Sequence, residues 1–229
     1  MQADKLYIVL SAVPLGCESN PDKGSGMIVI GADEVGSGDT FCGLVVSAAC
    51  VDEEQGEILK AFRVRDCKKI SDSRIGQYVG LIRKAGVRHS TIAITPDAFN
   101  ELSSQMSHVQ IQNMLYQKAI SNLLGKVGRP DKIIVDRYPG AKIAVDHIDL
   151  VMVPKAEERY VAVAAASILA RSAYLGMKRS LERELGMRIP LGSRNVREAL
   201  RDLLRKEVDV SRYAKLYPNN VREVLRETR

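Results

Sequence analysis

Aromatic side chains are scarce in this sequence. It has no tryptophan, and the aromatic residues make up only 5% of its 229 positions. Proteins that hold single-stranded nucleic acid by stacking its bases depend on such side chains. The composition therefore argues against base stacking as the main mode of recognition. The 45% hydrophobic and 27% charged residues are typical of a globular domain.

Cysteine is rare as well, and its spacing is irregular. Cys17, Cys42, Cys50 and Cys67 form no Cys-x-x-Cys pair, which argues against a zinc knuckle and against a redox pair. A chain of this length can bury enough apolar surface without disulfides. Scattered free thiols are typical of the reducing cytosol.

Long hydrophobic runs are absent. The apolar stretch within residues 1–16 follows a single lysine, is too short to span a bilayer and has poor flanks for a signal peptide. No other segment of the sequence approaches membrane length. We therefore expect a cytoplasmic protein that does not bind membranes, and we expect it to be a monomer.

Positive charge is unevenly distributed along the chain. Its 34 Lys and Arg against 28 Asp and Glu give a net charge of +6. Residues 1–170 carry a net charge of −1, and residues 171–229 carry +7. Two interpretations stay open at this point, namely solvated basic helix faces or a surface that contacts a phosphate backbone.

Short β-branched runs alternate with segments of helical periodicity, which predicts an α/β fold. The expected strands cover residues 27–32, 44–51, 88–95, 132–135 and 148–153. The expected helices cover residues 72–85, 109–124 with Gly125 as their stop, 156–185, 195–206 and 221–228. The first two strands are too closely connected to be parallel, so we predict a mixed sheet flanked by helices. We predict a short extension over residues 1–26 and one domain over 27–229, which ends in basic helices from about residue 171.

Common catalytic motifs are incomplete. Gly31 and Gly36 have the glycine spacing of a P-loop, but Ser37 and Gly38 stand where its Lys-Ser/Thr pair is required. The sequence has no Gly-x-Ser-x-Gly elbow, and its three histidines lie at no ligand-like spacing. Nucleotide binding by a P-loop and serine hydrolase chemistry are therefore not supported.

Asp33 and Glu34 follow a short apolar strand and precede a glycine-rich turn. Taken alone, they fit a turn-initiating aspartate beside a solvated glutamate. Neighbouring side chains on a strand point to opposite faces, so both carboxylates reach one site only if the chain bends there. Gly36 and Gly38 supply that freedom and would let backbone amides approach a ligand closely.

Two further carboxylates stand at the ends of predicted elements. Asp136 closes an apolar run, where open α/β sheets place ligand sites, and Glu157 lies in the predicted first turn of the buried helix. Each also has a structural explanation, as a turn residue and as an acid favoured at a helix N-terminus. Four carboxylates without a nearby histidine indicate a hard cation such as Mg²⁺ or Mn²⁺. Two such ions can cleave a phosphodiester, so an acidic site beside a basic C-terminal quarter is typical of a nuclease.

Four motifs in fixed order carry a family resemblance. They are DEVGSGDTF at 33–41, VRDCKKISD at 64–72, IIVDRY at 133–138 and PKAEERYVAVAAASILAR at 154–171, with IPLGS and AKLYPNN further on. Together they resemble the type 2 and type 3 ribonucleases H, and more closely type 3, ribonuclease HIII. The resemblance implies a ribonuclease H-like mixed sheet flanked by helices.

The resemblance also implies an activity and a set of site residues. The expected enzyme cleaves the RNA strand of RNA–DNA hybrids with two divalent ions, Mg²⁺ or Mn²⁺, and leaves 5′-phosphate and 3′-hydroxyl ends. The implied catalytic and metal-binding carboxylates are Asp33, Glu34, Asp136 and Glu157. The implied substrate-binding residues are Gly36, Ser37 and Gly38 in a loop that reads ribose 2′-hydroxyls, Lys68 at a phosphate, and Ser167 and Arg171 on a helix beside the substrate.

The sequence departs from the family pattern at several positions. Cys67 replaces the usual serine of Asp-Ser-Lys, Cys42-Gly43 replaces Gly-Pro, and Tyr116-Gln117 stands where a His-Asn pair is expected. Type 3 enzymes usually carry an N-terminal substrate-binding domain, and the 26 residues before the first motif are too few for it. No carboxylate is replaced, so catalysis is still expected.

Three functions stay in competition. The first is an endonuclease that cuts within RNA runs paired to DNA, which we favour because the C-terminal tyrosine context of type 2 enzymes is not found. The second is a junction-type ribonuclease HII that acts at single embedded ribonucleotides. The third is a non-catalytic hybrid-binding module. In each case we expect the basic C-terminal charges, such as Arg201, Arg205 and Lys206, to contact the hybrid.

Overall fold

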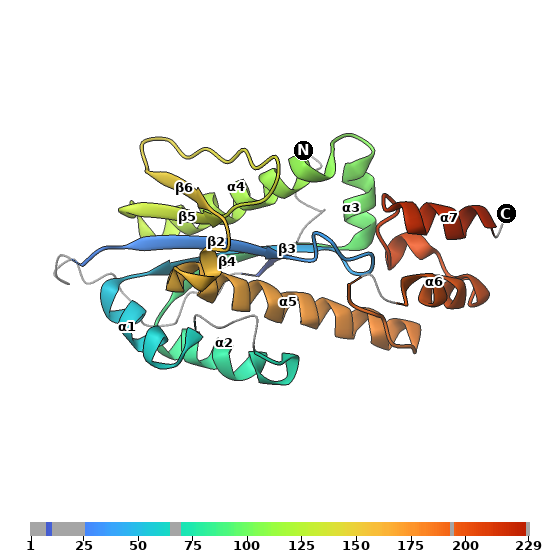
Figure 1. Ribbon diagram of the computed structural model, residues 1–229, viewed down its shortest axis with the longest axis horizontal. Helices are drawn as coiled ribbons and strands as arrows, with labels where there is room; N and C mark the ends of the chain where they lie inside the picture. The colour runs from blue at the N-terminus through green and yellow to red at the C-terminus, as the bar shows by residue number, and fades with distance from the viewer. Residues whose placement is uncertain (1–7, 11–25, 65–69, 193–194, 228–229) are drawn as a thin grey trace.

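The computed structural model describes residues 8–10, 26–64, 70–192 and 195–227. Figure 1 shows a mixed sheet between two layers of helices, with a further group of helices at one end. The six strands are β1 (Ile8–Leu10), β2 (Val29–Val35), β3 (Leu44–Val51), β4 (Arg88–Ile94), β5 (Lys132–Asp136) and β6 (Leu150–Val153). Their order is β1-β4-β3-β2-β5-β6. The β2–β3, β3–β4 and β1–β4 pairs are antiparallel, while β2–β5 and β5–β6 are parallel, which confirms the predicted mixed sheet.

Helices cover both faces of the sheet. The α-helices are α1 (Glu53–Ala61), α2 (Ile75–Lys84), α3 (Pro96–Ser103), α4 (His108–Val127), α5 (Val161–Leu185), α6 (Val196–Arg205) and α7 (Asn219–Glu227). Short 3₁₀ turns lie at Asp72–Arg74 (η3), Ala156–Glu158 (η4) and Val210–Arg212 (η5). Helices α3 and α4 lie on one face of the sheet, and α5 lies on the other face with α1 and α2 packed against it (Figure 1).

Alternation along β2 explains how the two layers pack. Ile30 and Ala32 are fully buried in the core cluster that contains α4, whereas Gly31 faces α5. A Cβ atom on Gly31 would lie 2.2 Å from the backbone carbon of Ala162 and from the backbone nitrogen of Val163. The backbone of α5 therefore rests directly on the strand, and the alanine-rich sequence of the helix permits this close contact.

The C-terminal helices form a second core at the far end of α5. Leu200 of α6 and both Val221 and Val224 of α7 are fully buried there. Phe41 and Val45 belong to the same cluster, so the group is continuous with the sheet. Within the described part of the chain, no helix is both long and apolar enough to cross a membrane.

Several helix boundaries differ from the sequence prediction, and two of these differences have a clear cause in the backbone. The helix expected from residue 156 begins only at Val161, because Lys155 adopts a left-handed conformation (φ 53°) and Tyr160 an extended one, which leaves η4 as a separate turn. The helix expected to stop at Gly125 continues to Val127 and ends before Gly128, whose φ is 77°. Hydrogen bonding along an established helix tolerates Gly125, whereas the positive φ of Gly128 takes the backbone out of the helical conformation and ends it.

Three elements were not predicted. Helix α1 starts from a capping box in which Asp52 and Gln55 bond each other's backbone N–H groups, and α3 starts at Pro96 after Thr95. Strand β1 lies within the segment predicted to be an extension and pairs with β4 at the sheet edge. Short elements of this kind carry too few periods for a hydrophobic pattern to be detected.

Candidate active site

The four predicted carboxylates lie around one cleft. Parallel pairing of β2 with β5 sets Ala32 opposite Val135, so Asp33 and Asp136 follow on adjacent strands. Glu157 approaches from η4, which β5 contacts. The cleft has a volume of about 260 Å³ and is lined by Asp33, Glu34, Val35, Asp136, Glu157, Ser167, Ile168 and Arg171. The fold thus brings the carboxylates together with Ser167 and Arg171 from residues far apart in sequence.

Asp33 and Glu34 reach the cleft without the predicted bend. Both belong to β2, which stays paired with β3 through Val35. Asp33 accepts a hydrogen bond from Ser167 of α5, whereas Glu34 accepts one from the hydroxyl of Tyr116 in α4. Strand β5 ends at Asp136, so beside these residues the sheet has an open edge. A ligand at this edge can contact side chains from both faces.

Burial and mutual repulsion destabilise the ionised carboxylates. Burial raises the pKa of Asp33 well above its ordinary value, the charges of Glu34 and Asp136 raise it further, and the hydrogen bond from Ser167 lowers it. Burial also raises the pKa of Glu34, and the hydrogen bond from Tyr116 partly offsets that effect. A bound cation would remove the cost of holding these charges together.

The donor set of the cleft fits a hard divalent cation. Its possible ligands are carboxylate oxygens, and neither histidine nor cysteine lines it. Among the described residues, no three such side chains already form a metal-binding group. Glu34 is turned toward Tyr116, and Asp136 Oδ1 accepts the Ala156 N–H at 2.8 Å. The cleft thus offers oxygen donors suited to Mg²⁺ or Mn²⁺, and two of its carboxylates are also held in place by hydrogen bonds from the protein.

The 36–38 loop leaves β2 one residue beyond the cleft. Gly36 has φ 97°, and a Cβ atom there would lie 2.5 Å from the Tyr174 ring, so this position requires glycine. Gly38 is exposed, and a Cβ atom there would meet no protein atom within 4 Å. The protein itself therefore imposes no steric need for glycine at position 38, which leaves room for a ligand to approach the backbone.

Two of the predicted substrate-binding residues, Arg171 and Lys68, lie outside the 36–38 loop and differ in what the structure describes. Arg171 pairs with Asp72, with Nη2 at 2.6 Å and Nε at 3.0 Å from Oδ1. This contact joins α5 to η3, whose first residue is the last residue of the 64–72 motif. Lys68 lies outside the described residues.

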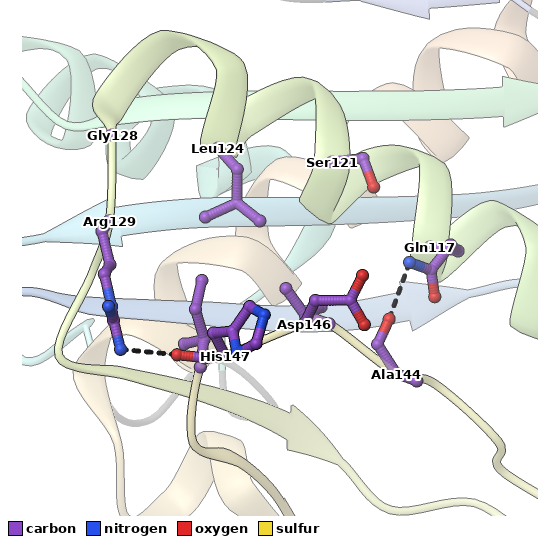
Figure 2. A pocket seen from close by; sticks show the side chains of 10 residues that line it. Gln117, Ser121, Leu124, Gly128, Arg129, Ala144, Asp146 and His147 are labelled. Carbon is purple, nitrogen blue, oxygen red and sulfur yellow. Dashed lines mark hydrogen bonds between the residues drawn. The ribbon is translucent and has the colours of Figure 1, made fainter.

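Tyr116 and Gln117, which differ from the family pattern, have separate structural roles. Tyr116 is fully buried, bonds Glu34 and stacks on Tyr138 with ring centroids 5.2 Å apart. Gln117 Nε2 donates to the Ala144 carbonyl at 2.8 Å (Figure 2). The sequence marked both positions as unusual but carried no signal that Tyr116 contacts a carboxylate 82 residues away.

A second hollow lies between α4 and residues 144–148, away from the carboxylates. Its volume is about 450 Å³, and Asp146 is its single acidic lining residue. Figure 2 shows Arg129 reaching the His147 carbonyl, 2.6 Å away, and Gln117 reaching Ala144. These contacts attach residues 144–147 to α4 and to the segment just after it, and no carboxylate of the cleft lines this hollow.

Comparison with known proteins identifies the family of this chain. The sequence pattern of ribonuclease HII matches residues 30–216, which includes every carboxylate of the cleft. The chain belongs to the ribonuclease HII family. Ribonuclease HIII of Streptococcus pneumoniae strain CGSP14 is 34% identical over 180 residues, which cover 74% of this chain. The matched region spans 62% of that relative's own length.

Solved structures of the ribonuclease HII family share the fold. Bst-RNase HIII in complex with Mn²⁺ superimposes with a TM-score of 0.80 at 28% identity, covering 89% of this chain and 70% of that chain. The RNase H3 of Aquifex aeolicus gives a TM-score of 0.71 at 30% identity, covering 82% and 71%. The ribonuclease H-like fold predicted from the motifs is therefore confirmed, and the likeness to ribonuclease HIII is confirmed with it.

Proposed function

We propose that this protein is a ribonuclease H that hydrolyses the RNA strand of RNA–DNA hybrids and leaves 5′-phosphate and 3′-hydroxyl ends. The observation that carries the proposal is the convergence of Asp33, Glu34, Asp136 and Glu157 on one cleft in a member of the ribonuclease HII family. A binding module gains nothing from carboxylates that face phosphates, because like charges repel. The same carboxylates are useful to an enzyme that binds cations between itself and the substrate.

The four carboxylates would hold two divalent ions, Mg²⁺ or Mn²⁺, and Mn²⁺ is present in the related Bst-RNase HIII structure. When bound, such ions activate a water molecule and stabilise the leaving oxygen. The protein's own residues prepare the site: Ser167 orients Asp33, and Tyr116 orients Glu34. The 36–38 loop would present backbone amides to the ribose, the part of the substrate that distinguishes RNA from DNA.

Product mapping separates the three candidate functions. We expect labelled RNA–DNA hybrid to be cut within the RNA run in the presence of Mg²⁺ or Mn²⁺, and a duplex with one embedded ribonucleotide to be cut poorly. Efficient incision at the single ribonucleotide would favour the type 2 activity. Hybrid binding without cleavage under either ion would establish the binding module and reject the proposed enzyme.

The arginines of the basic C-terminal region fall into two groups that differ in their ion pairs. Arg197, Arg201 and Arg205 pair with Glu223, Glu227 and Asp202. In contrast, Arg179, Arg183 and Arg188 line a hollow of about 790 Å³ at the end of α5, where Arg188 is attracted to Glu182 but none of the three forms a close ion pair with a described residue. Its one acidic lining residue, Glu182, is bonded to Lys178 at 2.5 Å. The available positive charge therefore lies at this hollow more than on α6.

We expect the triple change R179Q/R183Q/R188Q to raise KM for a long hybrid with little effect on kcat. Each phosphate that an arginine no longer neutralises should reduce the slope of log affinity against log salt by about 0.9. The matched control R197Q/R201Q/R205Q removes the same charge from ion-paired positions and should change KM less. Equal effects of the two triple variants would show that total charge alone matters.

A further inference from the structure

A segment near the C-terminus holds the 36–38 loop from the protein interior. Lys215 is fully buried, and its Nζ donates a hydrogen bond to the Gly36 carbonyl. Two residues later, the Tyr217 hydroxyl donates to the Ser37 carbonyl at 3.0 Å. Two consecutive carbonyl groups of the loop are thus bonded by side chains about 180 residues away in sequence.

Peptide geometry links these contacts to the exposed side of the loop. In a trans peptide, the carbonyl of one residue and the N–H of the next point in opposite directions within one plane. Holding the Gly36 and Ser37 carbonyls inward therefore turns the N–H groups of Ser37 and Gly38 away from Lys215 and Tyr217. Neither N–H group has a hydrogen-bond partner among the described residues.

A fully buried amine at position 215 carries a desolvation cost that its contacts must offset. Burial lowers the pKa of Lys215 to about 8, although the charge of Asp39 opposes that shift. The amine lies 5.2 Å from the centre of the Phe99 ring and 6.0 Å from that of the Tyr217 ring, distances at which aromatic faces attract a cation. Among the described residues, the hydrogen-bond acceptor of this amine is the Gly36 carbonyl, so the amine binds the 36–38 loop directly.

We propose that Lys215 and Tyr217 are positioning residues that keep the Ser37 and Gly38 amides aimed at the substrate and so set the preference for RNA–DNA hybrid over DNA duplex. This inference rests on the proposed function, because the loop must face the ribose of the RNA strand. Both residues act through the loop and neither needs to touch the substrate. Their replacement should therefore change discrimination between the two duplexes more than it changes general affinity.

The test compares the dissociation constants of an RNA–DNA hybrid and a DNA duplex of the same sequence, measured in EDTA so that neither is cleaved. The wild-type protein should prefer the hybrid. Tyr217→Phe removes one hydrogen bond and should reduce this preference about threefold to tenfold. Lys215→Met keeps the side-chain length but removes the amine, and it should reduce the preference at least as much.

Tyr213→Phe is the matched control. Its hydroxyl bonds Glu184 at 2.9 Å, so this variant removes a tyrosine hydroxyl from the same segment without touching the loop. It should keep the wild-type preference. If Lys215→Met does not fold, Tyr217→Phe decides the question alone.

The possible results distinguish failure of the proposed function from failure of the positioning role. A wild-type protein that neither distinguishes the hybrid from DNA nor cleaves the hybrid with Mg²⁺ or Mn²⁺ would overturn the proposed function, and one that cleaves the hybrid without binding it in preference to DNA would overturn the positioning role. A wild-type protein that does distinguish them, with the preference unchanged in folded Tyr217→Phe, would overturn the positioning role even if the variant is less stable.

Discussion

Replacing Asp33 with asparagine is expected to abolish hybrid cleavage and to raise the free energy of unfolding in the absence of metal. The activity should fall about a thousandfold or more, because the change removes a carboxylate from a site whose ions would supply several kcal/mol of transition-state stabilisation. The stability should rise, because Asp33 is buried beside Glu34 and Asp136, which disfavour its charge. Asp136→Asn should lose activity to a similar extent.

The stability effect depends on pH in a defined direction. A carboxyl with a raised pKa binds its proton more tightly in the folded protein than in the unfolded chain. The folded state is therefore favoured below the ordinary value of 3.8, and this advantage is lost as the pH rises through the higher folded pKa. Urea unfolding in EDTA should show a larger difference between Asp33→Asn and wild type at pH 7 than at pH 4.

Asp146→Asn provides the matched control for this experiment. Asp146 is exposed and lines the second hollow, not the carboxylate cleft. The same chemical change there should leave cleavage and stability near wild-type values. Undiminished cleavage by Asp33→Asn, with the control behaving as expected, would reject the assignment of the active site.

Replacing Gly31 with alanine is expected to cause a large loss of stability. The new methyl group would lie 2.2 Å from backbone atoms of Ala162 and Val163, and a backbone cannot move aside as a flexible side chain can. Overpacking of this kind costs about 3 kcal/mol or more. Because α5 also carries Ser167, any shift that relieves the contact should move this residue away from Asp33 and lower the activity of the remaining folded protein.

Gly125→Ala is the matched control, since it makes the same change within a helix where no atom lies within 4 Å of the new methyl group. It should stabilise the protein by about 0.5–1 kcal/mol, because alanine loses less conformational freedom in a helix than glycine. Urea unfolding curves of both variants check the pair. Equal stability of Gly31→Ala and wild type would contradict the close packing of α5 on β2.

The sequence by itself determined the chemistry of the candidate site and the class of the fold. Asp33, Asp136 and Glu157 were recognisable because each stands at the end of an apolar run or opens a conspicuous motif, and the absence of histidine around them indicated oxygen ligands. The alternation of β-branched and helical segments was sufficient for a mixed α/β sheet, because the periods of 2 and 3.6 residues are local properties of the chain.

Only the tertiary structure decided how these residues are held. The sequence did not show the open sheet edge beside Asp33 and Glu34. It also did not show the hydrogen bonds from Tyr116 to Glu34 and from Lys215 and Tyr217 to the 36–38 loop, which connect segments from 82 to 180 residues apart. The sequence likewise gives the charges of Arg201 and Arg205 but does not show that both form ion pairs. Such contacts depend on strand register and helix packing, and a one-residue shift in either would break them without altering any local sequence pattern.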